Sequence, residues 1–356
     1  MRPLIIPIFV IHKGCPNRCV FCNERIAAGD YSDRLTGDTV RAVCDRHLTE
    51  GGRKFDQIAF YGGNFTGMDR GYQIELLDVA QSYIDAGMAG SIRISTRPDY
   101  IDDERIGLIT RYRVSTVEIG AQSMVDEVLS ASRRGHSSED VREAVRLLKK
   151  NGIKTGVHLM AGLPGDTRER FEYTVEEIIG LRPDTVRIHP TIVFRNTALA
   201  EAYQKSTYLP LALDDAIDLC KHALLRFRKA GIPVIRLGLH ATKEMEANHN
   251  IIAGPFHPAF RSLVEGSLFL DMATELLGSA DLKRKEVVFS VAPQDVSNLR
   301  GMKNRNIRIL KESFDLTEIQ IMENTGQERG SLRIDERSVP YISSDSRNKK
   351  YLTGNE

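Results

Sequence analysis

Apolar runs alternate with polar, glycine-containing stretches through the first 240 residues of the chain. Short runs of apolar and β-branched residues that end at glycine, proline or polar positions predict β-strands. Between these runs, apolar residues recur three and four positions apart, which predicts amphipathic helices, the last of them over 214–230. Ser138 is predicted to cap the helix that Gly152 follows. Strands are expected at 5–11, 57–61, 92–96, 116–120, 154–160 and 185–189, with a candidate seventh at 234–237.

This alternation of strands and helices predicts a parallel sheet with right-handed crossovers. Six or seven strand–helix units fall short of the eight that close a TIM barrel. The predicted fold class is therefore α/β, a partial, open (β/α)6 TIM-type barrel. The polar, glycine-rich stretches follow the predicted strands, and the chemistry of such barrels gathers at the C-terminal ends of the strands.

The rhythm changes after residue 240. Residues 241–280 are expected to be helical with one irregular stretch at 254–261, followed by a strand at 286–290, a helix at 295–314 and a strand at 318–322. The predicted domains are the barrel at 1–240, a helical extension at 241–281, a small C-terminal α+β module at 282–336 and a polar tail at 337–356.

Composition narrows the class of protein. The chain has 356 residues, of which 41% are hydrophobic, and a formal net charge of +1, so any basic patch must be local. No window reaches the about 18–20 apolar residues of a membrane helix, and five cysteines with three clustered do not indicate a secreted disulfide framework. We therefore expect a cytoplasmic protein with no membrane partner.

Three of the five cysteines fall within the stretch Cys15-Pro-Asn-Arg-Cys19-Val-Phe-Cys22. Thiolates select iron–sulfur clusters or zinc. Three thiolates leave one coordination position open, as a catalytic metal requires. Two alternatives remain at this point, half of a structural zinc site with His12 as a fourth ligand and ordinary buried thiols. The other two cysteines, Cys44 and Cys220, lie on the apolar faces of predicted helices and are expected in the core.

The chain resembles the radical S-adenosylmethionine (radical SAM) superfamily in this cysteine spacing, in Phe21 before the last cysteine and in the Gly62-Gly63 pair after a strand. The resemblance extends to Gly120-Ala-Gln-Ser123 and Arg134-Gly-His136. It implies a [4Fe–4S] cluster ligated by Cys15, Cys19 and Cys22, reductive cleavage of S-adenosylmethionine to a 5′-deoxyadenosyl radical, and a one-electron donor of the flavodoxin or ferredoxin type.

The same resemblance assigns a set of residues to S-adenosylmethionine. In the coproporphyrinogen-oxidase-like and elongator-like branches, a glutamine after the fourth strand and an arginine beyond it hold the methionine moiety and ribose. Asn64 and Ser95 stand where relatives often carry carboxylates. An arginine can pair with the methionine carboxylate, and glycines let backbone approach the ligand. The expected cofactor-binding residues are Phe21, Gly62, Gly63, Asn64, Ser95, Gln122, Arg134, Gly162 and Leu163.

The closer resemblance is to the elongator catalytic-subunit-like branch, without its acetyltransferase domain, over roughly residues 5–240. It rests on the segments 118–129, 134–136, 162–167 and 189–195. That family installs a carbon substituent at C5 of the wobble uridine in tRNA, which implies tRNA modification here. Substrate candidates are His189, Arg195 and His257, with His240 also near the expected barrel mouth.

The C-terminal segment Gly301-Met-Lys-Asn304 resembles the Gly-x-x-Gly loop with which KH modules clamp nucleic-acid backbone. Basic residues surround it that can meet RNA phosphates, although a solvated helix face explains them as well. They are Arg300, Lys303, Arg305, Arg308 and Lys311.

Two other functions remain open at the level of the sequence. The Gln122 and Arg134 pair also fits an enzyme that acts on a small molecule such as a tetrapyrrole. A non-enzymatic RNA-binding protein stabilised by zinc or a cluster is the third possibility.

Overall fold

The structure is a computed structural model that describes residues 4–11, 13–16, 18–24, 26, 35–51, 54–239, 242, 245, 250–279 and 285–334. It divides into two compact units, one of residues 1–212 with 232–256 and one of residues 213–231 with 257–356. The boundaries predicted at 240, 281 and 336 stay a prediction. The predicted tail at 337–356 lies outside the described residues, as do His12 and His240.

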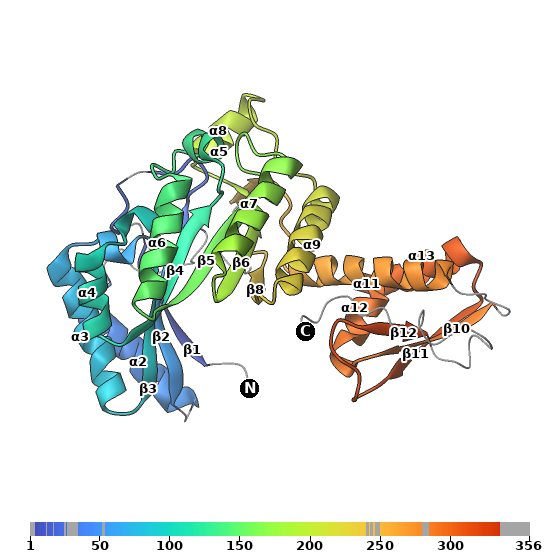
Figure 1. Cartoon of the computed structure of the whole chain (residues 1–356), viewed down its shortest axis with the longest axis horizontal. Helices are drawn as coiled ribbons and strands as arrows, with labels where there is room; N and C mark the ends of the chain where they lie inside the picture. The colour runs from blue at the N-terminus through green and yellow to red at the C-terminus, as the bar shows by residue number, and fades with distance from the viewer. Residues whose placement is uncertain are drawn as a thin grey trace. The chain divides into compact units, whose positions relative to one another are not determined.

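Seven parallel strands form a curled sheet in the first unit (Figure 1). Strand order follows chain order, and β1 and β8 occupy the two ends of the sheet, so the barrel is open. This confirms the predicted partial TIM-type barrel, with the candidate seventh strand present. The strands are β1 Ile5–Phe9, β2 Phe55–Tyr61, β3 Ala89–Thr96, β4 Val114–Gln122, β5 Lys154–Ala161, β6 Thr185–Pro190 and β8 Val234–Leu237.

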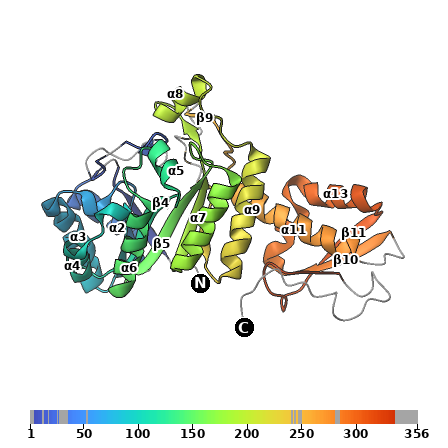
Figure 2. The ribbon, with the colours of Figure 1, turned by 45° about the horizontal axis from the view of Figure 1, so that its top comes forward.

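Helices cover the outer face of this sheet (Figures 1 and 2). Helix α3 packs against β3, α4 against β4, and α6 against both β4 and β5. Two single turns of 3-10 helix, η1 Phe65–Gly67 and η2 Pro98–Tyr100, follow β2 and β3. The helices of the unit are α2 Gly37–Gly51, α3 Arg70–Asp85, α4 Asp103–Arg111, α5 Asp126–Ala131, α6 Ser138–Lys150, α7 Arg168–Leu181 and α8 Ala198–Gln204.

Alternation along each strand separates the core from the inner face of the barrel. In β3, Ile92 and Ile94 are fully buried, whereas Arg93 and Ser95 take the positions between them. Successive side chains of a strand point to opposite faces. The apolar set packs under the helices, and the polar set is left for the inside of the barrel.

The first unit also holds a two-stranded antiparallel sheet of β7 Val193–Phe194 and β9 Ile251–Ala253. Strand β9 lies within the region predicted to be helical, so that expectation was wrong for 251–253. The reason is its partner: β7 is an adjacent edge that supplies hydrogen bonds which a helix of three apolar residues would not have.

The second unit packs helices against a three-stranded sheet in the order β11-β10-β12. Its core includes Phe269 and Met272 from α11, Phe289 from β10 and Leu310 from α13. Its elements are α9 Leu213–Lys229, α11 Phe260–Gly278, β10 Glu286–Val291, η3 Pro293–Asp295, α12 Val296–Arg300, η4 Met302–Asn304, α13 Arg305–Phe314, β11 Glu318–Glu323 and β12 Leu332–Ile334.

Two further expectations about helices were wrong in detail. The helix predicted at 295–314 is broken, because Gly301, Lys303 and Asn304 all have positive φ. The cap of α6 is Ser137 rather than Ser138: its hydroxyl accepts a hydrogen bond from the Asp140 backbone N–H, and Asp140 accepts one from the Ser137 N–H in return.

Cys44 and Cys220 are fully buried, which confirms their assignment to the core. None of the helices that the structure describes has the length and apolar character needed to cross a lipid bilayer.

Candidate functional site

A cavity of about 1290 Å³ lies along the C-terminal halves of the barrel strands. The loop that follows β1 forms one wall, and the strands β1 to β6 and β8 line the cavity together with the segments that follow α5 and precede α8. The lining includes all three clustered cysteines and most of the residues predicted to bind the cofactor. Those that line it are Cys15, Cys19, Phe21, Cys22, Gly62, Gly63, Ser95, Gln122 and Arg134.

The loop that carries the cysteines is held against the loop after β2 by close backbone contacts. Gly63 has a φ of +60°, and a Cβ there would lie 2.6 Å from the Val10 carbonyl oxygen. Gly14 has a φ of +74°, and a Cβ there would lie 2.1 Å from the Asn64 carbonyl oxygen. Only glycine fits such approaches. The Gly63 N–H also donates to the Glu24 carboxylate at 2.8 Å, just past Cys22.

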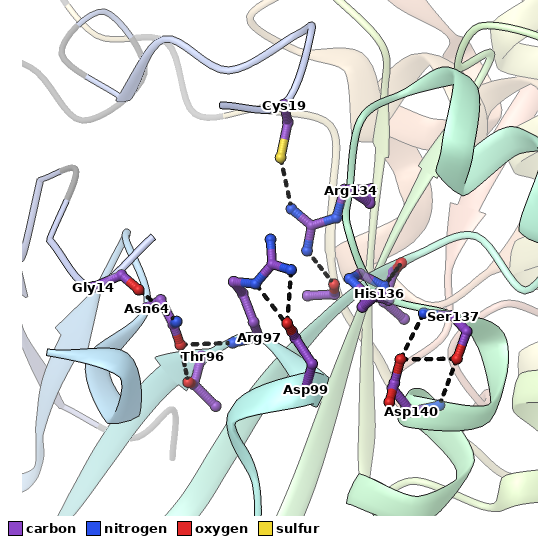
Figure 3. Close-up of polar contacts among 12 residues, drawn as sticks. Gly14, Cys19, Asn64, Thr96, Arg97, Asp99, Arg134, His136, Ser137 and Asp140 are labelled. Carbon is purple, nitrogen blue, oxygen red and sulfur yellow. Dashed lines mark hydrogen bonds and ion pairs between the residues drawn. The ribbon is translucent and has the colours of Figure 1, made fainter. Parts of the chain in front are cut away.

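Asn64 stabilises the contact between these two loops through its side-chain hydrogen bonds. It is not among the described residues that line the cavity. Its side-chain amide donates to the Gly14 carbonyl at 2.8 Å (Figure 3). Its Oδ1 accepts from the Thr96 hydroxyl at 2.6 Å and from the Arg97 N–H at 3.2 Å. Asn64 is fully buried. It therefore joins the cysteine loop to the end of β3, a role for which a carboxylate is not suited, since it cannot donate to Gly14.

Arg134 connects the cysteine loop to the end of β4 (Figure 3). One terminal nitrogen donates to the Cys19 sulfur at 3.1 Å, and the other donates to the Gly120 carbonyl at 2.7 Å. Arg134 is buried, and its Nε has no hydrogen-bond partner among the residues that the structure describes. The Arg134 guanidinium thus brings a positive charge beside a thiol, and one donor remains free for an acceptor in the cavity.

Other buried polar atoms in the lining lack partners. Gln122 ends β4 with a φ of +70°, and its Oε1 has no partner. Arg97 pairs with Asp99 at 2.8 and 3.0 Å, yet one of its terminal nitrogens is unpartnered and buried (Figure 3). Buried polar groups in proteins are nearly always hydrogen-bonded. These atoms therefore indicate a polar ligand in the cavity.

Gly162 and Leu163 are not part of this lining. The Gly162 N–H donates to Asp166 and its carbonyl accepts from the Tyr208 hydroxyl at 2.7 Å. Leu163 is buried in an apolar cluster with Val128 and Met160, against which Phe21 packs. The backbone N–H and carbonyl of Gly162, which was predicted to bind the cofactor, are thus already engaged by contacts within the protein.

The predicted substrate residues are dispersed. His189 lines the cavity. Arg195 is exposed and outside the lining, and its N–H donates to the Asn250 carbonyl. His257 belongs to the second unit, where its Nδ1 accepts from the Ala259 N–H at 3.0 Å. Of the three, only His189 is brought to the site.

Several polar residues of the barrel strands line the cavity but were not predicted as site residues from the sequence. These positions alternate with buried apolar residues, and period-two polar positions in strands that are otherwise buried were the available signal. They are Glu118, His158, Arg187 and Arg236, and Arg97 also lines the cavity, from the position just after β3.

Two histidines, the half-buried His158 and the buried His189, form a pair on the neighbouring strands β5 and β6. The His158 Nε2 and the His189 Nδ1 are 2.9 Å apart. Burial, with Arg187, Arg134 and Arg236 nearby, lowers the pKa of His158 to about 3. Burial and His158 hold the pKa of His189 well below its usual range. Both imidazoles are therefore neutral in the folded chain at physiological pH.

The environment of the clustered cysteines favours binding of a soft metal cation by their thiols. Burial, Glu24 and Cys19 raise the pKa of the Cys15 thiol to about 11, and the same causes together with Cys15 raise that of Cys22. Such thiols ionise when a metal compensates the thiolate charge. Among the described residues, no three His, Cys, Asp or Glu side chains are close enough to hold a metal ion. The donor set nevertheless fits an iron–sulfur cluster, since three thiols line one polar cavity.

The profile of the Radical SAM superfamily matches residues 9–178, and that of the Radical_SAM C-terminal domain matches residues 183–269. The tRNA uridine(34) acetyltransferase of Methanocaldococcus jannaschii is 27% identical over 259 residues, which are 62% of this chain and 48% of that protein. The enzyme of the same name from Methanocaldococcus infernus is 36% identical over 133 residues, 36% of this chain and 25% of that one.

The chain thus spans about half of the first of these relatives and about a quarter of the second. Among solved structures, the archaeal Elp3 of Methanocaldococcus infernus with residues 1–46 deleted superposes with a TM-score of 0.59 at 24% identity. This match covers 75% of the present chain and 63% of that one, and it supports the same fold.

Proposed function

The chain belongs to the radical SAM superfamily, and from this membership we propose that it cleaves S-adenosylmethionine reductively in order to modify tRNA. As a member it is an enzyme that binds a [4Fe–4S] cluster and S-adenosylmethionine. The alternative of a non-enzymatic, metal-stabilised protein is therefore wrong. When bound, the cluster supplies the single electron that splits the carbon–sulfur bond of the sulfonium.

In this proposal Cys15, Cys19 and Cys22 hold the cluster, because they line one cavity and follow one another on a loop that glycines seat tightly. Arg134 holds the carboxylate of S-adenosylmethionine with the donor that the protein leaves free. Gln122 and Ser95 face the ribose, and Gly62 and Gly63 leave room for the ammonium group. These residues position the reactive bond and exclude water from it.

The observation that carries the cofactor assignment is the hydrogen bond of Arg134 to the Cys19 sulfur. This hydrogen bond connects Cys19, which is predicted to bind the cluster, with Arg134, which is predicted to bind the methionine carboxylate. Cys19 would hold the cluster and Arg134 would hold the carboxylate of S-adenosylmethionine, and a cluster that reduces this molecule would have to lie beside it, so these two residues need to be neighbours.

Similarity to tRNA uridine(34) acetyltransferases supports tRNA as the substrate. Enzymes of this superfamily need a one-electron donor, and we propose one of the flavodoxin or ferredoxin type. Since tRNA and these donors meet in the cytoplasm, the proposal requires that location. A flipped nucleotide is the form in which a base can enter a barrel of this kind.

We further propose that the second unit binds RNA. The segment Gly301–Asn304 joins α12 to α13, and exposed basic side chains surround it. Arg305 stands in the first turn of α13, where a cation opposes the helix dipole and an anion is favoured. Lys311 instead donates to the Thr317 carbonyl at 2.7 Å. In the described part of the chain, no ion pair involves Arg300, Lys303, Arg305 or Arg308.

The test is an anaerobic 5′-deoxyadenosine assay on the reconstituted protein, with and without total tRNA. We expect product from the wild-type chain and more of it with tRNA. Cys19→Ala should abolish product, whereas Cys220→Ala, which removes a buried core thiol that is not among the lining residues of the cavity, should retain it. Cleavage that survives Cys19→Ala would disprove the cofactor assignment.

The substrate is tested separately with the nucleosides of tRNA from a deletion strain and its parent. A nucleoside that is missing after deletion and restored by wild-type protein in vitro supports the proposal. An unchanged nucleoside profile together with an accumulated small metabolite, such as a tetrapyrrole, would replace tRNA by the small-molecule alternative.

A further inference from the structure

The inner face of the barrel carries a cluster of cations that no step of cofactor binding uses. Arg187 on β6 and Arg236 on β8 are partners in the strand register. Both line the cavity. Together with Arg93 on β3, they surround a single carboxylate, that of Glu118 on β4.

Glu118 compensates only part of this charge. Its Oε1 accepts a hydrogen bond from Arg93 at 2.5 Å and forms an ion pair with a terminal nitrogen of Arg187 at 2.8 Å, so two guanidinium groups share one carboxylate oxygen. Arg236 forms no ion pair within the described residues. Three guanidinium groups around one carboxylate leave an excess of positive charge, and two of the three, those of Arg187 and Arg236, line the cavity. This charge must be compensated by a bound anion or by water.

A glycine on the strand between β4 and β6 allows the Glu118 carboxylate to reach Arg187. Gly156 lies on β5, opposite Glu118 in the register and between β4 and β6. A Cβ at Gly156 would lie 3.1 Å from the Cγ of Glu118 and 3.1 Å from the Thr185 hydroxyl. The Glu118 side chain can therefore cross β5 to reach Arg187, and the guanidinium is fixed in place.

Arg187 is further oriented by Tyr61, whose ring centroid lies 4.8 Å from the guanidinium carbon. A guanidinium over an aromatic face is held without losing its in-plane donors. Within the described residues, the buried Nε of Arg187 has no hydrogen-bond partner. Arg236 is exposed to solvent where it lines the cavity, and partial burial together with the proximity of Arg187 lowers its pKa.

His189 adds a neutral group beside Arg187, two residues along β6. His189 is 9% exposed, and in the described part of the chain its Nε2 has no hydrogen-bond partner. Its Nδ1 is engaged with the Nε2 of His158. When Nδ1 accepts the proton of His158, the Nε2 of His189 carries a hydrogen and becomes a donor. Such a donor completes a set of groups that is suited to oxygen anions.

We propose that Arg187, Arg236 and the Nε2 of His189 form a subsite for an anionic oxygen group, a carboxylate or a phosphate, of the molecule to be modified. The proposal rests on the proposed function and names a property of its substrate. The residues assigned to S-adenosylmethionine come from the cysteine loop, β2 to β4 and Arg134. The cation cluster on β6 and β8 is thus left for the second molecule in the cavity.

The experiment is isothermal titration of the reconstituted holoenzyme, saturated with S-adenosylmethionine, with pyrophosphate in one arm and succinate in the other. We expect the wild type to bind at least one of the two anions. Arg236→Gln should weaken that binding about tenfold or more, as expected for the loss of a charge-assisted hydrogen bond. A preference for pyrophosphate assigns the subsite to a phosphate, and a preference for succinate assigns it to a carboxylate.

Arg146→Gln is the matched control, because Arg146 is an exposed helix residue outside the cavity lining, and it should bind like the wild type. Arg187→Gln should weaken binding as well, but it also removes a partner of Glu118. Arg236→Gln breaks no ion pair and keeps the test valid if Arg187→Gln fails to fold. Unchanged affinity in Arg236→Gln, or no anion binding by the wild type, would overturn the subsite. If tRNA failed to stimulate cleavage, the proposed tRNA substrate would be in question, but the titration would still test whether the cavity binds an anion.

Discussion

At the scale of single residues, the cysteine loop depends on positions where a side chain cannot be accommodated. Gly63 illustrates this, since a Cβ there would lie 2.6 Å from the Val10 oxygen and 2.8 Å from the Lys13 oxygen. Both contacts are with backbone, which cannot yield as a side chain can. The placement of Cys15 and its neighbours is therefore coupled to a glycine outside the cysteine motif.

Gly63→Ala should lower the iron content of the reconstituted protein several-fold, because the cysteine loop must move away from the end of β2. Gly152→Ala is the matched control: Gly152 has a similar φ of +69°, but nothing lies within 4 Å of its added Cβ. Both variants carry the about 1–2 kcal/mol cost of a left-handed alanine. Only Gly63→Ala adds the backbone clash. Iron per chain and the thermal midpoint measure the two effects, and equal iron content in both variants would contradict the coupling.

At the scale of elements, the pattern of apolar residues was sufficient to predict the strands and the order of the barrel. It also placed Cys44 and Cys220 in the core, because helical spacing alone decides which face of a helix is buried. It could not identify Arg187 or Arg236, because whether a polar residue in a strand faces solvent or a barrel interior depends on the curl of the whole sheet. Strand β9 could not be predicted for a similar reason, because its partner strand β7 is far away in the sequence.

The His158 and His189 pair on β5 and β6 makes stability depend on pH. Burial holds the pKa of His158 near 3, whereas the unfolded chain takes up a proton near the usual value of about 6.5. The stabilising contribution is therefore present above that value and is lost as pH falls toward 3, since the unfolded chain then binds more protons. His158→Gln should flatten the fall in unfolding free energy between about pH 7 and 5.

Urea unfolding followed by circular dichroism at several pH values measures this slope, and the wild type under the same anaerobic conditions is the reference. Each neutral buried histidine contributes a slope of up to about 1.4 kcal/mol per pH unit. His158→Gln with the full wild-type slope would show that other groups cause the dependence.

The loop between α12 and α13 gives a prediction for RNA binding. Replacing Lys303 and Arg305 by alanine should weaken tRNA binding and reduce the slope of log affinity against log salt by about 1 for each lost phosphate contact. The matched double variant replaces Lys285 and Arg333, two basic residues of the same unit away from the loop. Filter binding over a range of salt concentrations measures both, and identical slopes in the two double variants would argue against the loop.

At the scale of the whole molecule, the two compact units are interleaved along the chain. Helix α9 stands in sequence between β6 and β8, yet it belongs to the second unit and packs against α11. Glu265 on α11 accepts from Arg228 of α9 at 3.3 Å and from Asn298 of α12 at 3.1 Å. The barrel sheet is therefore completed by β8 only after the chain has passed through the other unit.

This interleaving predicts that the barrel cannot be isolated by truncation after Phe256. The shortened chain would keep α9 but lose α11, and so expose the apolar face of α9 that packs against α11, which includes Leu225. Exposed apolar surface of this size favours aggregation. We expect the truncated protein to be largely insoluble, as measured by the soluble fraction after expression and by size-exclusion chromatography.

A control chain that ends at residue 336 keeps α9, α11 and the three-stranded sheet, and it should stay soluble because every described element of the second unit is retained. A soluble, monomeric chain of residues 1–256 with wild-type thermal stability would contradict the prediction. In that case α9 must find its apolar contacts within the barrel. The second unit would then be a separable addition whose removal tests RNA binding directly.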